Sequence, residues 1–246
     1  MRLIVATAAV LALAACKPAS ETAPVKAPAG AAAHWSYADQ ASWGGECPVG
    51  TAQSPVALTT AEAVDLPDIA TDYASGAGTL LNNGHTLQFT PDAAGRTRIG
   101  TDAYDLVQFH FHAPSEHTLD GKRYPLEIHF VNRNADGALA VVGVFVTEGA
   151  ANPALASLLA ALPSQAGEAG VTRPGVYPVL LLPEDRHYFA YAGSLTTPPC
   201  TEGVRWNVLS TPIAASGEQI AALSAALGAS NRAVQPMGDR SAAFGD

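Results

Sequence analysis

Most of this chain consists of short apolar or alternating runs that Gly, Pro, Asn or Asp interrupt every few residues, and this pattern constrains the fold more than any other feature. Such runs favour β-strands, because side chains two residues apart on a strand share a face. The candidate strands are 87–89, 105–112, 126–132, 138–147, 179–182, 187–192 and 204–210, with turns at 82–84 and 134–137. The sequence therefore predicts a mainly β domain of the α+β type.

Two segments favour helices instead. The first begins with Asn152 as a cap and proline at the first helical position, and leucines at 155, 158, 159 and 162 form one apolar face before Pro163 ends it. In the second, Ser216 and Gln219 can form a capping box ahead of an apolar stripe that stops at Gly228. Both stripes are expected to pack on the domain rather than to bind a cofactor.

The N-terminus has the layout of an exported lipoprotein. Residues 1–15 combine Arg2 with an apolar stretch, a signal-peptide pattern that falls short of the roughly 20 apolar residues of a membrane span. The stretch ends at Leu-Ala-Ala-Cys16, which resembles a bacterial lipobox with a lipidated cysteine; a plain signal peptide with an incidental cysteine is the alternative. Residues 16–33 read as a lipidated cysteine and flexible tether, and the expected location is the periplasm, anchored to a membrane through Cys16.

Residues 34–246 are long enough for one domain with a sizeable core. The chain carries 22 acidic and 13 basic side chains, and without a basic patch it gives no reason to expect a nucleic-acid partner. If Cys16 carries lipid, then Cys47 and Cys200 are the remaining candidates for a disulfide, which an oxidising compartment permits. Two buried free thiols are the alternative.

Two strand-like runs carry the chemistry. In 108–112, Gln-Phe-His-Phe-His, alternation places His110 and His112 on one face and both phenylalanines on the other. If the run around His129 is an antiparallel neighbour, three neutral imidazoles can hold one ion with a fourth position open, as in catalytic zinc sites. Gln108 and Glu127, each two residues before a histidine, can accept a hydrogen bond from a ligand's other ring nitrogen.

Several blocks together resemble the alpha-class carbonic anhydrases, in the bacterial, exported form. The matching blocks lie at 34–37, 53–56, 81–85, 108–112, 115–117, 127–131, 193–199, 206–209 and 235–236. The resemblance covers nearly all of 34–246, which would be the catalytic domain. It implies a twisted, largely antiparallel central sheet of about ten strands with a few short helices, and zinc at the base of a conical cavity. The implied reaction is the zinc-dependent reversible hydration of carbon dioxide to bicarbonate and a proton, by attack of zinc-bound hydroxide.

The resemblance also implies roles for individual residues. Zinc would be bound by His110, His112 and His129, with Gln108 and Glu127 orienting the ligands. Thr196, held by Glu116, would accept the proton of the hydroxide, and His85 would be the proton shuttle. The remaining roles are a substrate pocket of Val131, Val141, Leu195, Thr197 and Trp206, a water network of Tyr37, Asn83 and Gln88, and a disulfide between Cys47 and Cys200.

The chain departs from the family pattern at two places. Only two residues separate His112 from Ser115, where animal members have a longer loop, so the cavity rim should be more open. Ala233 stands where a proline usually follows the arginine, which leaves the carbonyl partner of His112 unassigned. Expected partners are carbon dioxide and bicarbonate, sulfonamide or anion inhibitors, and a membrane through the lipid; a homodimer is among the oligomeric states left open.

Two functions of other classes remain as alternatives. A non-catalytic binding module on the same fold would have lost ligand histidines, but all three are present here, with Thr196 and Glu116. A tethered zinc carrier would have His-rich or acid-rich tracts, which the sequence lacks. A slow zinc-hydroxide esterase activity of the same site is compatible with carbon dioxide hydration as a side activity. His117 is expected to make an internal hydrogen bond, and His34 and His187 to lie at the surface or rim.

Overall fold

Strands dominate the computed structural model, which describes residues 35–160, 162–163, 165–168, 171–172 and 175–246. The strands are β1 (Ala57–Leu58), β2 (Ile69–Asp72), β3 (Gly78–Asn82), β4 (Leu87–Pro91), β5 (Arg96–Ile99), β6 (Asp102–His112), β7 (Thr118–Leu119), β8 (Leu126–Arg133), β9 (Leu139–Glu148), β10 (Val171–Thr172), β11 (Tyr188–Ser194), β12 (Glu202–Ala215) and β13 (Ala243–Gly245). The helices are α1 (Pro153–Leu159), α2 (Gly217–Leu227) and the 3₁₀ segments η1 (Tyr37–Ser42) and η2 (Pro178–Leu181). The signal peptide, Cys16, the tether and His34 lie outside the described residues.

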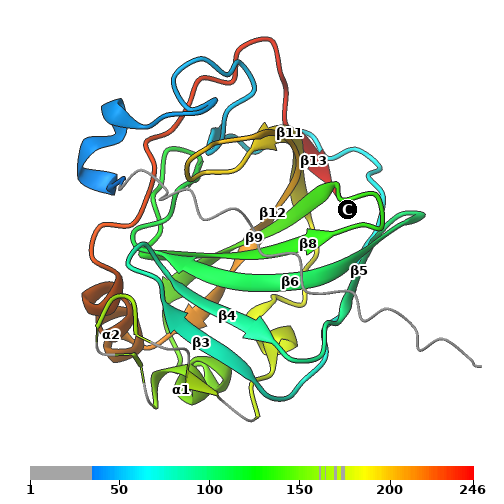
Figure 1. Cartoon of the computed structure of the whole chain (residues 1–246). Helices are drawn as coiled ribbons and strands as arrows, with labels where there is room; N and C mark the ends of the chain where they lie inside the picture. The colour runs from blue at the N-terminus through cyan, green and yellow to red at the C-terminus, as the bar shows by residue number, and fades with distance from the viewer. Residues whose placement is uncertain (1–34, 161, 164, 169–170, 173–174) are drawn as a thin grey trace, which may run out of the picture. The chain divides into compact units, whose positions relative to one another are not determined.

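Eleven strands form one twisted sheet (Figure 1). Its order is β10-β3-β4-β6-β8-β9-β12-β11-β13, with β5 pairing β6 and β2 pairing β5. All of these pairs are antiparallel except β9 with β12, and a separate short parallel pair joins β1 to β7. The predicted largely antiparallel sheet of about ten strands is therefore confirmed.

Six of the seven candidate strands are confirmed, and one is wrong. The run 179–182 lies mostly in η2, which starts at Pro178. Proline at the first position presets the helical φ angle, and the four apolar residues that follow show no alternation to favour a strand. Their burial is also irregular, since Leu181 is buried while Leu180 is 48% exposed.

The two helices are capped as expected. The Asn152 side chain accepts hydrogen bonds at the start of α1, and Ser216 with Gln219 forms the capping box of α2. Gln219 also exchanges hydrogen bonds of 2.8 Å with the backbone of Asn152, so the two helix starts are joined. Figure 1 shows α1 and α2 beside each other. Helix α1 ends at Leu159, three residues before the predicted end, because Pro163 disfavours the helical conformation of the residue before it and cannot donate to the carbonyl of Leu159.

The sheet separates two apolar clusters. The larger contains Phe109, Phe111 and Phe130 together with residues of α1 and α2. The smaller lies around Trp206 and Phe189. The phenylalanines between the histidines of β6 thus pack in the larger cluster, as alternation predicts, and the histidines occupy the opposite face.

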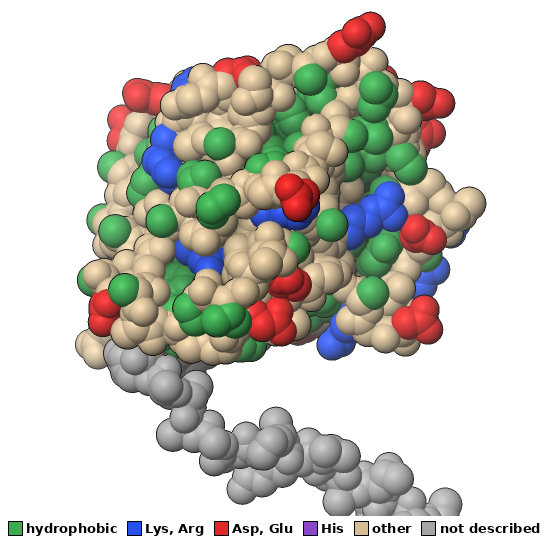
Figure 2. Space-filling model, turned by 90° about the horizontal axis from the view of Figure 1, so that it is seen from above, with side chains coloured by type: hydrophobic (Ala, Val, Ile, Leu, Met, Phe, Trp, Pro, Cys, Tyr) green, Lys and Arg blue, Asp and Glu red, His purple; other side chains and the backbone are tan. Residues whose placement is uncertain are grey.

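No helix in the described part of the chain is long and apolar enough to cross a membrane. The face shown in Figure 2 carries acidic and basic side chains interspersed among neutral and apolar ones.

Candidate metal centre

The register of β6 and β8 brings three histidines to one point. His110 lies directly opposite His129 in the antiparallel ladder, and His112 is two residues further along β6 on the same face. One ring nitrogen from each of the three lies within 4.8 Å of the others. Gly143, which pairs with His129 from β9, places no side chain beside this group. The antiparallel neighbours that the sequence predicts are therefore present.

The other ring nitrogen of each histidine is held by the protein. His110 Nδ1 lies 2.9 Å from Gln108 Oε1, and His129 Nε2 lies 2.9 Å from Glu127 Oε1. His112 Nδ1 lies 2.6 Å from the carbonyl oxygen of Ser230, the partner that the sequence left unassigned. A backbone carbonyl more than a hundred residues away has no sequence signal, so this contact could not be found from the pattern.

These contacts leave His110 Nε2, His112 Nε2 and His129 Nδ1 for a ligand. His112 Nε2 is buried and has no hydrogen-bond partner among the described residues. Burial and the neighbouring histidines lower the pKa of His110 well below 6.5, and burial lowers that of His112 to about 4. Three neutral imidazole nitrogens, oriented by acceptors on their far sides, suit zinc.

Glu127 is the anionic centre behind the ligands. Oε1 is the partner of both His129 and His117, at 2.9 and 2.7 Å, and Oε2 accepts the backbone N–H groups of Glu116 and His117. Burial alone would raise the pKa of Glu127, but its electrostatic interactions and hydrogen bonds with His117 and His129 bring it well below 4.5. His117 also lies 2.7 Å from the Tyr191 hydroxyl, which confirms its internal hydrogen bonding.

Glu116 is fully buried next to the same histidines. Its Oε1 accepts a hydrogen bond from the Arg232 backbone N–H at 2.7 Å. Burial raises the pKa of Glu116 to about 7, while His129, Thr196 and the Arg232 N–H act to lower it. Thr196 is thus close enough to affect this carboxyl, although Oε2 completes no hydrogen bond of regular geometry with a described residue.

A small cavity of about 120 Å³ opens onto two of the histidines. Its lining residues are Trp35, Tyr37, Asn83, His85, Thr86, Gln88, Gln108, His110, His112 and Thr197. His85 stacks on Trp35 with ring centroids 3.7 Å apart, a contact that the sequence did not predict. The Tyr37 hydroxyl is buried without a hydrogen-bond partner among the described residues, and burial, followed by the charge of Glu116, raises its pKa.

Of the five residues assigned to the substrate pocket, Thr197 lines this cavity and the four apolar ones do not. Val141 and Trp206 are buried in the smaller cluster, and Val131 and Leu195 pack against it. The Trp206 ring lies edge-on to His129, with centroids 4.8 Å apart. The ring of Trp206 therefore places an apolar surface beside the third histidine.

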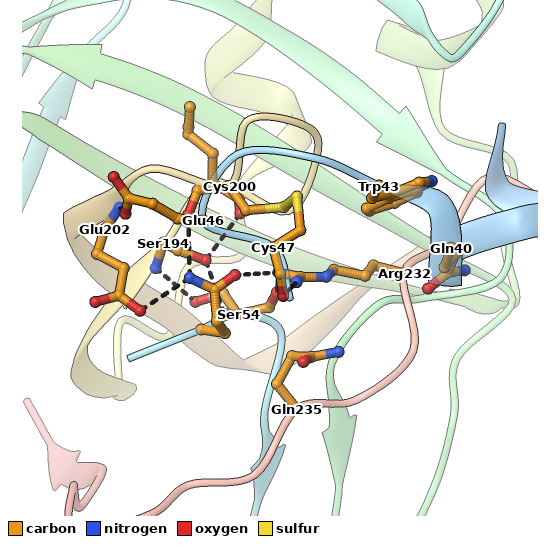
Figure 3. Close-up of a disulfide and its surroundings, with 12 residues drawn as sticks. Gln40, Trp43, Glu46, Cys47, Ser54, Ser194, Cys200, Glu202, Arg232 and Gln235 are labelled. Carbon is orange, nitrogen blue, oxygen red and sulfur yellow. Dashed lines mark hydrogen bonds between the residues drawn. A yellow bond between two sulfur atoms is a disulfide. The ribbon is translucent and has the colours of Figure 1, made fainter. Parts of the chain in front are cut away.

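The disulfide between Cys47 and Cys200 is present and spans 153 residues of sequence (Figure 3). Cys200 donates its backbone N–H to the carbonyl of Thr197, and Glu46 donates to the carbonyl of Pro199. The disulfide therefore holds the loop that carries Thr196 and Thr197 against the N-terminal part of the domain. His187, by contrast, is 39% exposed in its side chain, as expected for a histidine outside the site.

Comparison with known proteins gives one family. Residues 32–241 match the family model described as eukaryotic-type carbonic anhydrase. A carbonic anhydrase of Pectobacterium carotovorum is 42% identical over 217 residues, which cover 84% of this chain and 89% of the relative.

Two solved structures share the fold. The alpha-carbonic anhydrase of Thermovibrio ammonificans with the inhibitor sulfanilamide has a TM-score of 0.76 at 40% identity, covering 80% of this chain and 88% of that one. A carbonic anhydrase of Chlamydomonas reinhardtii in complex with acetazolamide has a TM-score of 0.75 at 34% identity, covering 86% and 99%. The chain therefore belongs to the eukaryotic-type, or alpha-class, carbonic anhydrases and is an enzyme of that family.

Proposed function

We propose that this protein catalyses the zinc-dependent reversible hydration of carbon dioxide to bicarbonate and a proton. One observation carries the proposal: three neutral imidazoles each present a nitrogen to the same point, and His112 Nε2 is buried there with nothing in the described chain to bond. His110, His112 and His129 would hold the ion. Zinc bound in this way supplies a Lewis acid that makes water a nucleophile near neutral pH.

Thr196 and Glu116 would orient the nucleophile. If the Thr196 hydroxyl donates to Glu116, its oxygen is left to accept a hydrogen bond from the attacking oxygen, which directs a lone pair at the carbon of carbon dioxide. Glu116 can act as this acceptor because it is held by the Arg232 N–H and lies beside Thr196. Gln108 and Glu127 would keep the ligand rings in the orientation that faces the ion.

His85 would carry the proton away from the site. It lies in the cavity lining with Tyr37, Asn83 and Gln88, and it stacks on Trp35. Imidazole is the side chain that ordinarily exchanges protons near neutral pH, so a histidine in this lining suits a relay between the site and solvent. The three neighbouring polar side chains would order the water through which the proton passes.

The test is a stopped-flow assay of carbon dioxide hydration with zinc-loaded protein. We expect turnover well above the uncatalysed rate and inhibition by a sulfonamide, since relatives of this fold are found in complex with sulfanilamide and acetazolamide. Ester hydrolysis is measured on the same samples, and hydration should be much the faster reaction. A zinc-loaded protein that does not hydrate carbon dioxide would rule out the proposed function.

We also propose that the protein is exported and anchored by a lipid on Cys16. The support is the signal-peptide and lipobox pattern, together with a disulfide of the kind that persists in oxidising compartments. Cell fractionation with metabolic lipid labelling tests this. The wild type should be labelled and sediment with membranes, whereas Cys16→Ser should be unlabelled. An unlabelled wild type would contradict the anchor.

A further inference from the structure

The peptide bond between Asn231 and Arg232 carries hydrogen bonds at both ends. On one side, the Arg232 N–H donates to Glu116 Oε1 at 2.7 Å in a buried position. On the other side, the Asn231 carbonyl accepts from the side-chain amide of Gln40 at 3.0 Å. Because a peptide group is planar and rigid, a contact that fixes the direction of its carbonyl also fixes the direction of its N–H.

Gln40 holds the next peptide group as well. Its Oε1 accepts the backbone N–H of Ala233 at 2.9 Å, while its amide nitrogen also donates to the carbonyl of Tyr37 within η1 at 3.2 Å. The carboxamide of Gln40 therefore bonds to the backbone on both sides of Arg232. A proline at position 233 would have no N–H to offer, so the alanine that departs from the family pattern supplies this donor.

The ends of the same segment are anchored separately. Ser230 is joined to the backbone of Ala113 by its own N–H and by its hydroxyl. The Arg232 guanidinium donates to Gln53, Ser54 and Cys47, next to the disulfide (Figure 3). These contacts fix the position of the segment. The Asn231–Arg232 peptide group itself has two hydrogen bonds, one from Gln40 and one to Glu116.

We propose that Gln40 is a positioning residue of the active site. Its carboxamide orients the Asn231–Arg232 peptide so that the N–H points at Glu116, and it acts through Glu116 on the hydroxyl of Thr196. A donor to the carbonyl also polarises the peptide, which strengthens the N–H as a donor on the far side. If the Gln40 side chain is removed, water can donate to the Asn231 carbonyl in its place, but a water molecule does not fix the direction of the peptide plane. The effect on turnover rests on the proposed function, whereas the effect on the peptide does not.

Three variants separate this role from general stabilisation. Gln40→Ala removes every side-chain contact. Gln40→Glu keeps an acceptor for Ala233 but cannot donate to Asn231. Gln235→Ala is the matched control, because its amide donates to the carbonyl of Ala233 at 2.8 Å but connects the segment only to itself.

The first measurement is NMR hydrogen exchange of the Arg232 amide in metal-free protein. A lost hydrogen bond of ordinary strength should speed this exchange about 2- to 10-fold in Gln40→Ala and in Gln40→Glu. Gln235→Ala should leave it unchanged. An Arg232 amide that stays fully protected in Gln40→Ala, or in Gln40→Glu alone, would overturn the proposal, as would equal loss of protection in Gln235→Ala.

The second measurement is hydration by the zinc-loaded variants. We expect both Gln40 variants to lose about 2- to 10-fold in kcat/KM, with a smaller change in kcat in dilute buffer, where proton release limits turnover. A purely structural role would instead reduce the active fraction and lower both constants by the same factor, which would contradict the proposal. If the wild type itself fails to hydrate carbon dioxide, the proposed function falls, and the amide exchange still decides the role of Gln40.

Discussion

Each histidine of the metal centre divides its two ring nitrogens between the fold and the ligand. His110 and His112 use Nδ1 for hydrogen bonds to Gln108 and the Ser230 carbonyl, whereas His129 uses Nε2 for Glu127. The side of the ring that bonds the protein fixes which nitrogen remains, so the three rings present two Nε2 atoms and one Nδ1. The hydrogen bonds of the fold therefore orient all three rings toward one point.

Removing one ring tests this arrangement. His129→Ala leaves two protein nitrogens in a site arranged for three, so it should lose most of its bound zinc and nearly all activity. The sheet should still fold, because β8 keeps its ladders with β6 and β9. Metal analysis and circular dichroism of the purified variant measure the two effects. Full zinc occupancy would show that His129 is not the third ligand.

The proton relay is a second property of single residues. His85→Ala should lower kcat several-fold in dilute buffer, because the proton loses its carrier, and should leave kcat/KM for hydration nearly unchanged, because the three ligand histidines and Thr196 remain in place. Added imidazole should restore kcat. A kcat that stays at the wild-type value in weakly buffered solution would mean that protons leave by another route.

At the scale of elements, the sequence predicts the strands and helices that have a periodic pattern, but it does not predict features that depend on long-range contacts. Alternation identifies β6 and β8 and the side of β6 that carries the histidines. The cap residues identify the starts of α1 and α2. The apolar run 179–182 fails because a fully apolar run has no period to distinguish a strand from a 3₁₀ turn after Pro178. The parallel pairing of β9 with β12 has no local signal at all.

The disulfide joins two elements that are distant in sequence. Cross-linking 153 residues restricts the unfolded chain, and such bonds typically contribute about 2–4 kcal/mol. Cys200→Ser should therefore lower the melting temperature by roughly 5–15 °C. The wild type should show no free thiol at Cys47 or Cys200 until it is reduced. Two titratable thiols in protein recovered from cells would contradict a disulfide that forms in vivo.

The turn before β11 should give a pH-dependent contribution to stability. Asp185 accepts hydrogen bonds from the Thr211 hydroxyl and from His187, which lower its pKa to about 2 and raise that of His187 above 6.5. The lowered pKa stabilises the fold above about pH 4, an effect lost as the pH falls toward 2. The raised pKa stabilises it below 6.5, an effect lost as the pH rises through the pKa of His187.

Asp185→Asn removes the contribution of Asp185 and the larger part of that of His187, whose Nε2 keeps Asp246 as a neighbour at 3.5 Å. Its melting temperature should lie below that of the wild type by about 1–3 °C between pH 4 and 6.5, with the difference narrowing on either side. Asp68→Asn is the charge-matched control, because Asp68 lines the same surface cleft. A difference that is constant from pH 2 to 9, or equal in the control, would argue against the linkage.

For the molecule as a whole, the blocks of sequence that resemble the family were enough to predict both the fold and the three metal ligands. Each block is a local pattern, and the blocks occur in the order that the family has. Contacts made by backbone groups were not predictable. The Ser230 carbonyl behind His112 and the Arg232 N–H at Glu116 depend on how a distant segment crosses the site, and any residue type has a carbonyl. The Trp35–His85 stack could not be predicted for the same reason, because it depends on where the first described residues lie in the fold.

Removal of the metal tests how far the fold and the site are independent. The two apolar clusters lie on either side of the sheet, and every ligand ring is held by a protein group, so a chelator should abolish hydration without unfolding the protein. An ion present at a thousandfold excess over its Kd stabilises a protein by about 4 kcal/mol, so the metal-free form should melt roughly 8–16 °C lower. Circular dichroism before and after chelation should show the same strand signal at 25 °C, and added zinc should restore activity. Unfolding at 25 °C would mean that the metal holds the fold together, and full activity without detectable metal would show that the histidines serve another chemistry.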